Sequence, residues 1–79
     1  MARMTPEARR ESIVAATLAV MHRQGIAATT VRDVAAALGT SSGLIHHYVT
    51  SMDELITEAF ELAATEDLER AAAAVSGGT

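Results

Sequence analysis

A three-residue break at Gly39-Thr40-Ser41 constrains the fold more than any other feature of this sequence, because it separates two very short predicted helices. Over residues 31–38, apolar side chains recur at three- and four-residue spacing, which predicts a helix of about two turns. After the break, Ser41 can accept hydrogen bonds from free amides, and residues 42–48 can form about two more turns. Two such helices joined by a short turn are typical of a compact helix-turn-helix unit.

Local signals predict where the first two helices begin. Thr5 is a suitable N-cap and Pro6 a suitable first helical residue, and Gly25 is a typical left-handed stop after that helix. Thr30, with Asp33 three residues later, forms an acidic version of the capping box. The second helix should therefore begin directly after Thr30.

A fourth, longer helix is predicted after the helix-turn-helix. Ser51 followed by Glu54 has the spacing of another capping box, and apolar residues at helical spacing continue well beyond it. We therefore predict an all-α fold in which residues 1–50 form a three-helix bundle, with the helix-turn-helix made by its second and third helices. Because the second helix of such a unit commonly enters the major groove, we expect this to be a DNA-binding bundle. Residues 51–75 should form the linking helix and residues 76–79 a flexible end.

Length and composition exclude several classes of protein. A chain of 79 residues has room for one small core. The lack of cysteine excludes disulfides, thiolate metal sites and thiol catalysis. No segment approaches the roughly 20 apolar residues of a membrane span, and no signal peptide is visible. We expect a soluble cytoplasmic protein without a membrane partner.

The net charge of −4 is distributed unevenly along the chain. Residues 1–32 hold five arginines against two glutamates, whereas residues 33–79 hold one arginine against eight acidic residues. A polyanion would therefore meet the first part of the chain, and the acidic last helix would have to point away from it.

The helix over residues 42–48 has distinct inner and outer sides. A helical wheel places Ile45 and Val49 inward, and Gly43 and His47 almost directly opposite. An outward glycine costs about 1 kcal/mol relative to alanine. Its missing side chain would let a phosphate or base edge approach closely; the alternative is that Gly43 only relaxes the turn.

A set of core, capping and turn positions between about Arg9 and Phe60 matches a known pattern without a gap. These positions are Ile13, Ala16, Gly25, Thr29-Thr30-Val31, Asp33-Val34-Ala35, Gly39, Ser41, Gly43, Ile45, Ser51 and Leu55. With them the chain resembles the tetracycline-repressor-like (TetR) family of bacterial regulators. The resemblance implies that three helices bind DNA and that the fourth links them to a larger helical domain, which dimerises and binds a small-molecule inducer that releases the DNA.

The resemblance also implies which residues contact a palindromic operator. They are Thr29, Thr30, Arg32, Ser41, Ser42, Gly43, Leu44, His46, His47 and Tyr48. The first three would meet phosphates where free amides begin the second helix. Ser42, Leu44 and His47 would face base edges. Tyr48 would add a phosphate or a packing contact, and His46 stands where such proteins usually have a phosphate-binding tyrosine.

Two further departures from the family pattern affect the predicted contacts. Met52 stands where the family commonly has a lysine that touches phosphate, and Val49 replaces a more usual phenylalanine. Each lost phosphate contact lowers the dependence of binding on salt by about one unit of slope. These changes bear on affinity rather than on the class of protein.

Other charged residues have two interpretations each. Arg3, Arg9 and Arg10 could form an arm that meets the DNA backbone, or only a solubilising surface; the arm is favoured because this end carries most of the positive charge. Glu54, Glu58 and Glu61 repeat at helical spacing and are interpreted as a solvated face rather than as acid-base pairs. No catalytic residue or enzyme activity is predicted.

Adjacent histidines do not predict a metal site. The rings of His46 and His47 diverge by roughly 100° on a helix and cannot hold one ion together. His47 facing DNA could instead make binding depend on pH near neutrality. We expect no metal and no cofactor.

The last helix suggests a rival function. It carries more apolar surface than a three-helix unit can cover, notably around Phe60 and Leu62, and such patches usually mark an interface. The family resemblance assigns that surface to a missing sensor domain, so we take the chain as a fragment of a protein that is a homodimer when full length. The alternative is a small helical module for protein-protein interaction that uses this helix.

Overall fold

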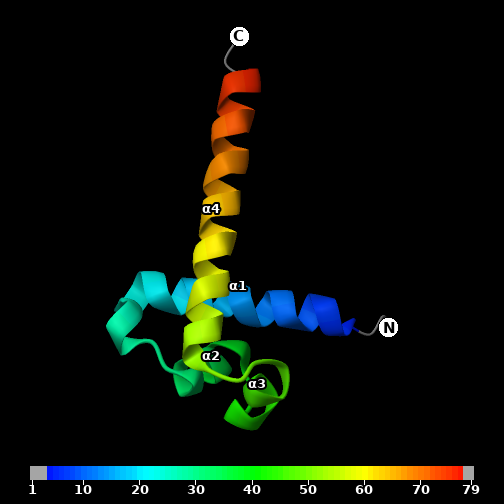
Figure 1. Cartoon of the computed structure of the whole chain (residues 1–79), viewed down its shortest axis with the longest axis vertical. Helices are drawn as coiled ribbons and strands as arrows, with labels where there is room; N and C mark the ends of the chain where they lie inside the picture. Colours follow the sequence, from blue (N-terminus) through cyan, green and yellow to red (C-terminus); the bar gives the residue numbers. More distant parts are fainter. Residues whose placement is uncertain (1–3, 78–79) are drawn as a thin grey trace.

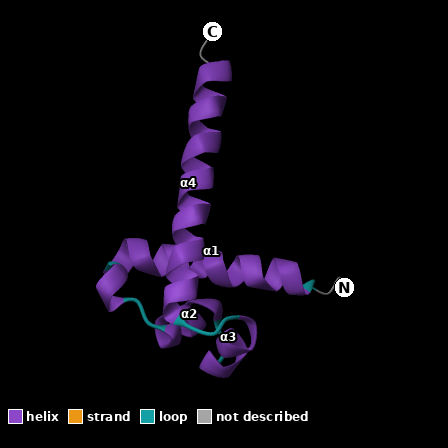
Figure 2. Cartoon of the chain, viewed as in Figure 1, coloured by secondary structure: helices purple, strands orange, loops and turns teal. Residues whose placement is uncertain are grey.

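The computed structural model describes residues 4–77 of the chain. Within this range all regular structure is helical, as Figure 2 shows, and the predicted all-α fold is confirmed. Four α-helices and one short 3₁₀ helix follow each other along the chain. They are α1 (Pro6–Gln24), η1 (Ile26–Ala28), α2 (Val31–Leu38), α3 (Ser42–Tyr48) and α4 (Met52–Gly77).

The helices divide the molecule into a packed end and a projecting arm. α1 packs against both α2 and the first part of α4, and α2 packs against α3. α4 crosses α1 and then rises away from α2 and α3, so its last turns lie at the opposite end of the molecule (Figure 1). The longest dimension, 48 Å, follows from this projection.

Side-chain caps begin the first three α-helices as the sequence predicts. The Thr5 hydroxyl oxygen accepts a hydrogen bond in the first turn of α1. The capping box of α2 is complete: the Asp33 amide donates to Thr30 Oγ1 at 3.2 Å, and the Thr30 amide donates to Asp33 Oδ2 at 3.2 Å. The Leu44 amide donates to Ser41 Oγ at 3.2 Å, which starts α3. Each cap satisfies amides that have no acceptor within the helix.

The two glycines that end α1 and α2 both have positive φ but differ in ψ. Gly39 is left-handed, with φ 69° and ψ 35°, as predicted. Gly25 combines φ 86° with an extended ψ of 158°, so the prediction of a left-handed stop is wrong in ψ. The extended ψ directs the chain into η1 instead of closing a compact turn. Both conformations favour glycine, since a Cβ is strained at positive φ.

α4 begins where the sequence predicts and continues further. The Glu54 amide donates to Ser51 Oγ at 3.3 Å, which supplies one half of the expected capping box. The helix includes Ser76 and Gly77, beyond the predicted end at residue 75, so the prediction of a flexible end is wrong for these two residues; residues 78–79 lie outside the described range. Within the described residues, no helix combines the length and apolar character needed to cross a bilayer.

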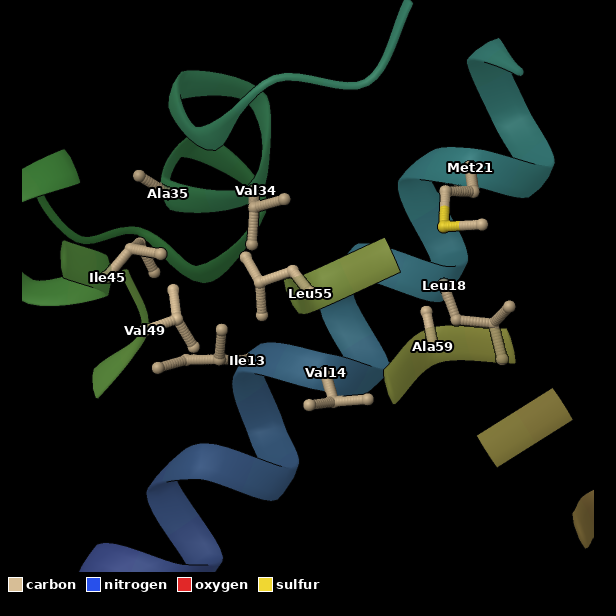
Figure 3. Packing of buried hydrophobic residues seen from close by; sticks show 10 residues of the cluster. All are labelled: Ile13, Val14, Leu18, Met21, Val34, Ala35, Ile45, Val49, Leu55 and Ala59. Carbon is tan, nitrogen blue, oxygen red and sulfur yellow. The ribbon is translucent and has the colours of Figure 1, made fainter. Parts of the chain in front are cut away.

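One apolar cluster joins all four α-helices. Figure 3 shows its side chains pointing toward one another: Ile13, Val14, Leu18, Met21, Val34, Ala35, Ile45, Val49, Leu55 and Ala59. Ile45 and Val49 bury the inner side of α3 in this cluster, as the helical wheel predicts. Met52, at the start of α4, packs against the same cluster. Burying one side of α3 leaves its opposite side free for another molecule.

Candidate nucleic-acid interface

Of the three predicted base-reading residues of α3, His47 lies on the exposed side, and Ser42 and Leu44 lie at its edges. Gly43, His46 and His47 are exposed, and Ser42 and Leu44 are half-buried at the edges of this side. The helix is held in place by its buried side, so the exposed side chains project from a rigid base. A short helix with one such free side has the shape required to enter a major groove.

Gly43 is not required by the fold of this chain. Its φ is negative, and a Cβ built on it would contact only Ser41 Oγ, at an ordinary 3.7 Å. A larger residue would therefore fit without strain and would favour the helix more strongly. This geometry supports the hypothesis that Gly43 allows a close approach from outside, over the alternative that it relaxes the turn.

The start of α2 presents Thr30 and Arg32 to solvent. The Thr30 hydroxyl donates to Asp33 Oδ2 at 2.8 Å, and Gln24 Nε2 donates to the same oxygen at 3.2 Å. These hydrogen bonds, with the one from Thr30 the stronger influence, lower the pKa of Asp33. The carboxylate completes the cap, while Arg32 remains exposed beside it.

Thr29 has a packing role in the structure. Its side chain is only 5% exposed, and its hydroxyl donates to the Gly25 carbonyl oxygen at 2.7 Å. A hydroxyl that is buried and engaged in this way does not present itself to a phosphate. Thr29 instead anchors the segment that leads from α1 into α2, and thereby positions Thr30 and Arg32. Sequence reasoning missed this role because Thr29 and Thr30 are identical residues at adjacent positions.

Tyr48 lies at the end of α3, partly buried against the apolar cluster. Its ring meets the ring of His47 edge-on, with centroids 5.4 Å apart and an interplanar angle of 82°. The packing contact that the sequence left open for Tyr48 is therefore present. Through it, the exposed His47 ring is supported by a side chain that reaches the core.

Arg10 is only partly exposed and is bound by groups of α3 and α4, which contradicts its interpretation as part of a free arm. Its Nε donates to Glu58 Oε1 at 3.1 Å and its Nη2 to Glu54 Oε2 at 3.2 Å. Nη2 also bonds Glu58 Oε2, and Nη1 donates to the Tyr48 carbonyl oxygen. The hydrogen bonds to Glu58, followed by the one to Glu54, raise the pKa of Arg10.

The same contacts correct the interpretation of the α4 glutamates. Glu54 and Glu58 are half-buried partners of Arg10 rather than members of a solvated face, whereas Glu61 is exposed as predicted. Arg9 is half-buried on α1, and Arg3 lies outside the described residues. Sequence reasoning missed these ion pairs because Arg10 is more than forty positions from both glutamates. Only the crossing of α1 and α4 brings them together.

Acidic side chains of the distal part of α4 lie far from α3. Glu66, Asp67 and Glu69 belong to the part of the helix that rises away from the packed end (Figure 1). At about 1.5 Å per residue, Glu66 is about 20 Å along the axis from the start of α4. This is more than two screening lengths at physiological salt, so these charges repel a polyanion at α3 only weakly.

Comparison with known families supports the assignment of this region. The sequence model of the bacterial regulatory proteins of the tetR family matches residues 13–59. The match covers more than half of the chain and includes most of α1, all of α2 and α3, and the first turns of α4. Comparisons with curated proteins and with solved structures gave no significant match.

Proposed function

Because this chain belongs to the tetR family of bacterial regulatory proteins, whose members are DNA-binding transcription regulators, we propose that α3 reads base edges in the major groove of its operator. The observation that carries the proposal is the division of α3 into two sides. Ile45 is fully buried, while Gly43 and His47 face solvent on the opposite side. A recognition helix needs both a fixed side and a free one.

We assign the contacts by position on the two short helices. Ser42, Leu44 and His47 would reach base edges, and Gly43 would let the DNA come close to the helix backbone. Exposed Arg32 and Thr30 at the start of α2 would contact phosphates, since first-turn amides and the helix dipole also favour anions.

The remaining predicted residues flank this surface. Ser41 caps α3 at the turn, and His46 and Tyr48 lie toward its end, where the DNA backbone would pass. Thr29 contributes indirectly through its hydrogen bond to Gly25. No catalytic step, metal or cofactor forms part of the proposal.

We further propose that the regulator acts as a homodimer on a palindromic operator in the cytoplasm, with the two recognition helices about 34–36 Å apart. The support lies in α4, where Phe60 is 52% exposed and Leu68 is 71% exposed. Apolar side chains on a projecting helix suit attachment of a further helical domain. In this proposal that domain dimerises and binds an inducer, whose binding releases the DNA and relieves repression.

The same exposed residues favour a second candidate, in which α4 is the functional surface of a protein-protein interaction module. That function would not need the chemistry of α3. Alanine at His47 would then leave every activity of the chain intact, whereas Leu68→Ala would reduce it.

The test is selection of random duplex DNA by the 79-residue chain at low salt, followed by titration of the enriched sequence with salt. We expect an enriched half-site of a few base pairs. His47→Ala should weaken its binding by about 5- to 150-fold, the range for loss of a base contact. His22→Ala is the matched control, because His22 is exposed on α1 outside the proposed surface.

Gly43→Ala separates binding from folding. Alanine should leave the free energy of unfolding unchanged or raise it by up to about 1 kcal/mol, because it favours the helix and meets no clash. The same methyl group would obstruct the close approach of DNA and lower affinity. A Gly43→Ala chain that binds the enriched DNA as tightly as the original would refute the close-approach role of Gly43.

A further inference from the structure

Arg10 connects three helices through one side chain. It projects from α1, both of its carboxylate partners belong to α4, and its carbonyl partner is the last residue of α3. Every nitrogen of its guanidinium takes part in at least one of these hydrogen bonds. The planar fork of arginine suits such an arrangement, because it can donate to several acceptors in fixed directions.

The contact with Tyr48 is made at a point where α3 needs an external donor. The last carbonyl groups of a helix have no partner within it, and the negative end of the helix dipole favours a nearby cation. Arg10 satisfies the Tyr48 carbonyl oxygen and supplies that cation. A helix of only seven residues depends strongly on such contacts, since its own hydrogen bonds are few.

Direct packing positions α3 mainly from the side that faces α2 and the core, rather than at the end near Arg10. The helix rests on α2, and Ile45 fixes its inner side in the core. At its C-terminal end, α3 is linked to α4 by the short segment of residues 49–51. Arg10, itself held by Glu54 and Glu58, is a second link between the start of α4 and this end of α3.

We propose that Arg10 is a positioning residue for DNA recognition, which Glu58 and Glu54 hold in place and which in turn sets the orientation of α3. The inference rests on the proposed function, because it concerns the helix assigned to the major groove. Arg10 contributes to affinity through the direction in which α3 presents His47 and Gly43. In this proposal it makes no phosphate contact, since each of its three guanidinium nitrogens already donates to a protein oxygen.

Glu58→Gln provides a test, because two explanations predict opposite changes in the affinity for DNA. Long-range electrostatics alone predicts that Glu58→Gln strengthens DNA binding, because it removes a negative charge from a chain of net charge −4. The positioning role predicts weaker binding, because the amide cannot replace the carboxylate that holds Arg10. Glu61→Gln is the matched control. Glu58 and Glu61 line one hollow between α1 and α4, but Glu61 is exposed, so its replacement should leave affinity equal or slightly higher.

The experiment measures the affinity of each variant for the enriched DNA over a range of salt concentrations. Glu58→Gln should weaken binding by about twofold to thirtyfold, the range for residues that act through a contact chain. The slope of affinity against salt should stay unchanged, because no phosphate contact is lost. Affinity for Glu58→Gln equal to or above that of the Glu61→Gln control would overturn the proposal.

Arg10→Lys gives a second test that keeps the net charge constant. A lysine has one ammonium group and cannot reach Glu54, Glu58 and the Tyr48 carbonyl together, so binding should weaken with the salt slope unchanged. Full affinity in Arg10→Lys would show that the fork of Arg10 is not needed and would refute positioning. A salt slope lower by about one unit would show that a phosphate contact of Arg10 is lost, which would also refute it. Circular dichroism at the assay temperature establishes that each variant is folded.

Failure of the proposed function and failure of the Arg10 role give different results. A chain without any substitution that enriches no DNA sequence would remove the proposed function and the positioning role with it. A chain that enriches a half-site, but whose affinity is insensitive to Glu58→Gln and to Arg10→Lys, would keep the function and remove the role of Arg10.

Discussion

The two halves of α4 have opposite surroundings although they form one continuous helix. In the first half, Leu55 and Ala59 are fully buried in the core, and Glu58 pairs with Arg10. In the second half, every residue over 64–74 is exposed. Tertiary packing therefore stabilises the first half, whereas the second half depends on the intrinsic helix propensity of an alanine-rich segment.

This difference predicts that changes in the two halves of α4 affect different functions, DNA recognition in the packed half and attachment of a further domain in the projecting half. The packed half of α4 is part of the unit that holds α3, so changes there should reach the proposed DNA surface. The projecting half rises away from the other helices (Figure 1), and its residues 64–74 are all exposed. Substitutions at matched positions in the two halves test this division.

The largest contrast is expected between two leucines. Leu55→Ala should reduce the free energy of unfolding by about 2–5 kcal/mol, because it removes a fully buried side chain from the core. Leu68→Ala, at a side chain 71% exposed, should change it by less than about 0.5 kcal/mol. Urea unfolding followed by circular dichroism measures both. Comparable losses for the two variants would show that the far half of α4 is packed in solution.

Glycine substitutions should separate global from local stability. Ala59→Gly should lower the free energy of global unfolding by about 1 kcal/mol or more, since the position is buried and helical. Ala72→Gly should leave global unfolding unchanged and increase only local opening of the projecting half. Amide hydrogen exchange resolves the two effects residue by residue. Faster exchange in α3 on Ala72→Gly would mean that the two halves unfold together.

The ion pairs of the two halves should differ in strength. Arg10 and Glu58 are 37% and 29% exposed and share more than one hydrogen bond, so a double-mutant cycle should give a coupling of about 0.5–1 kcal/mol. Arg70 and Asp67 are 77% and 73% exposed at 3.4 Å, and their coupling should be about 0.3 kcal/mol or less. Equal couplings in 0.15 M salt would contradict this ranking.

The smallest effect concerns acid sensitivity of the packed end. The pKa of Asp33 is lowered in the folded chain by its hydrogen bonds to Thr30 and Gln24, so its contribution to stability is present above the unfolded value, near pH 4. That contribution is lost as the pH falls through the lower folded value. The stability difference between the original chain and Asp33→Asn should therefore shrink below about pH 4. Asp67→Asn is the control, and a difference that stays constant with pH would refute the role of Asp33.

The starts of the helices and the inner side of α3 are predictable because their causes are local. The bonds from Asp33 to Thr30 and from Leu44 to Ser41 each span three residues, so spacing alone reveals them. The burial of Ile45 follows from helical periodicity in the same way. The family match agrees with the resemblance carried by these capping, turn and core positions.

Conformational details within a few residues were less predictable. Gly25 was expected to be left-handed, but its extended ψ depends on how the next segment packs after α1. Thr29 and Thr30 have the same chemistry and neighbouring positions, yet one is buried and the other exposed. Which threonine faces inward depends on the path of the chain between α1 and α2.

The sequence by itself determined the helices of this protein, the turn between α2 and α3, and the free side of α3, because caps and periodicity act within about four residues. Only the tertiary structure decided that Arg10 pairs with Glu54 and Glu58 and contacts Tyr48. The physical reason is that an arginine can pair with any carboxylate within reach. Its partners are selected by the crossing of α1 over α4, which the packing of the whole core establishes.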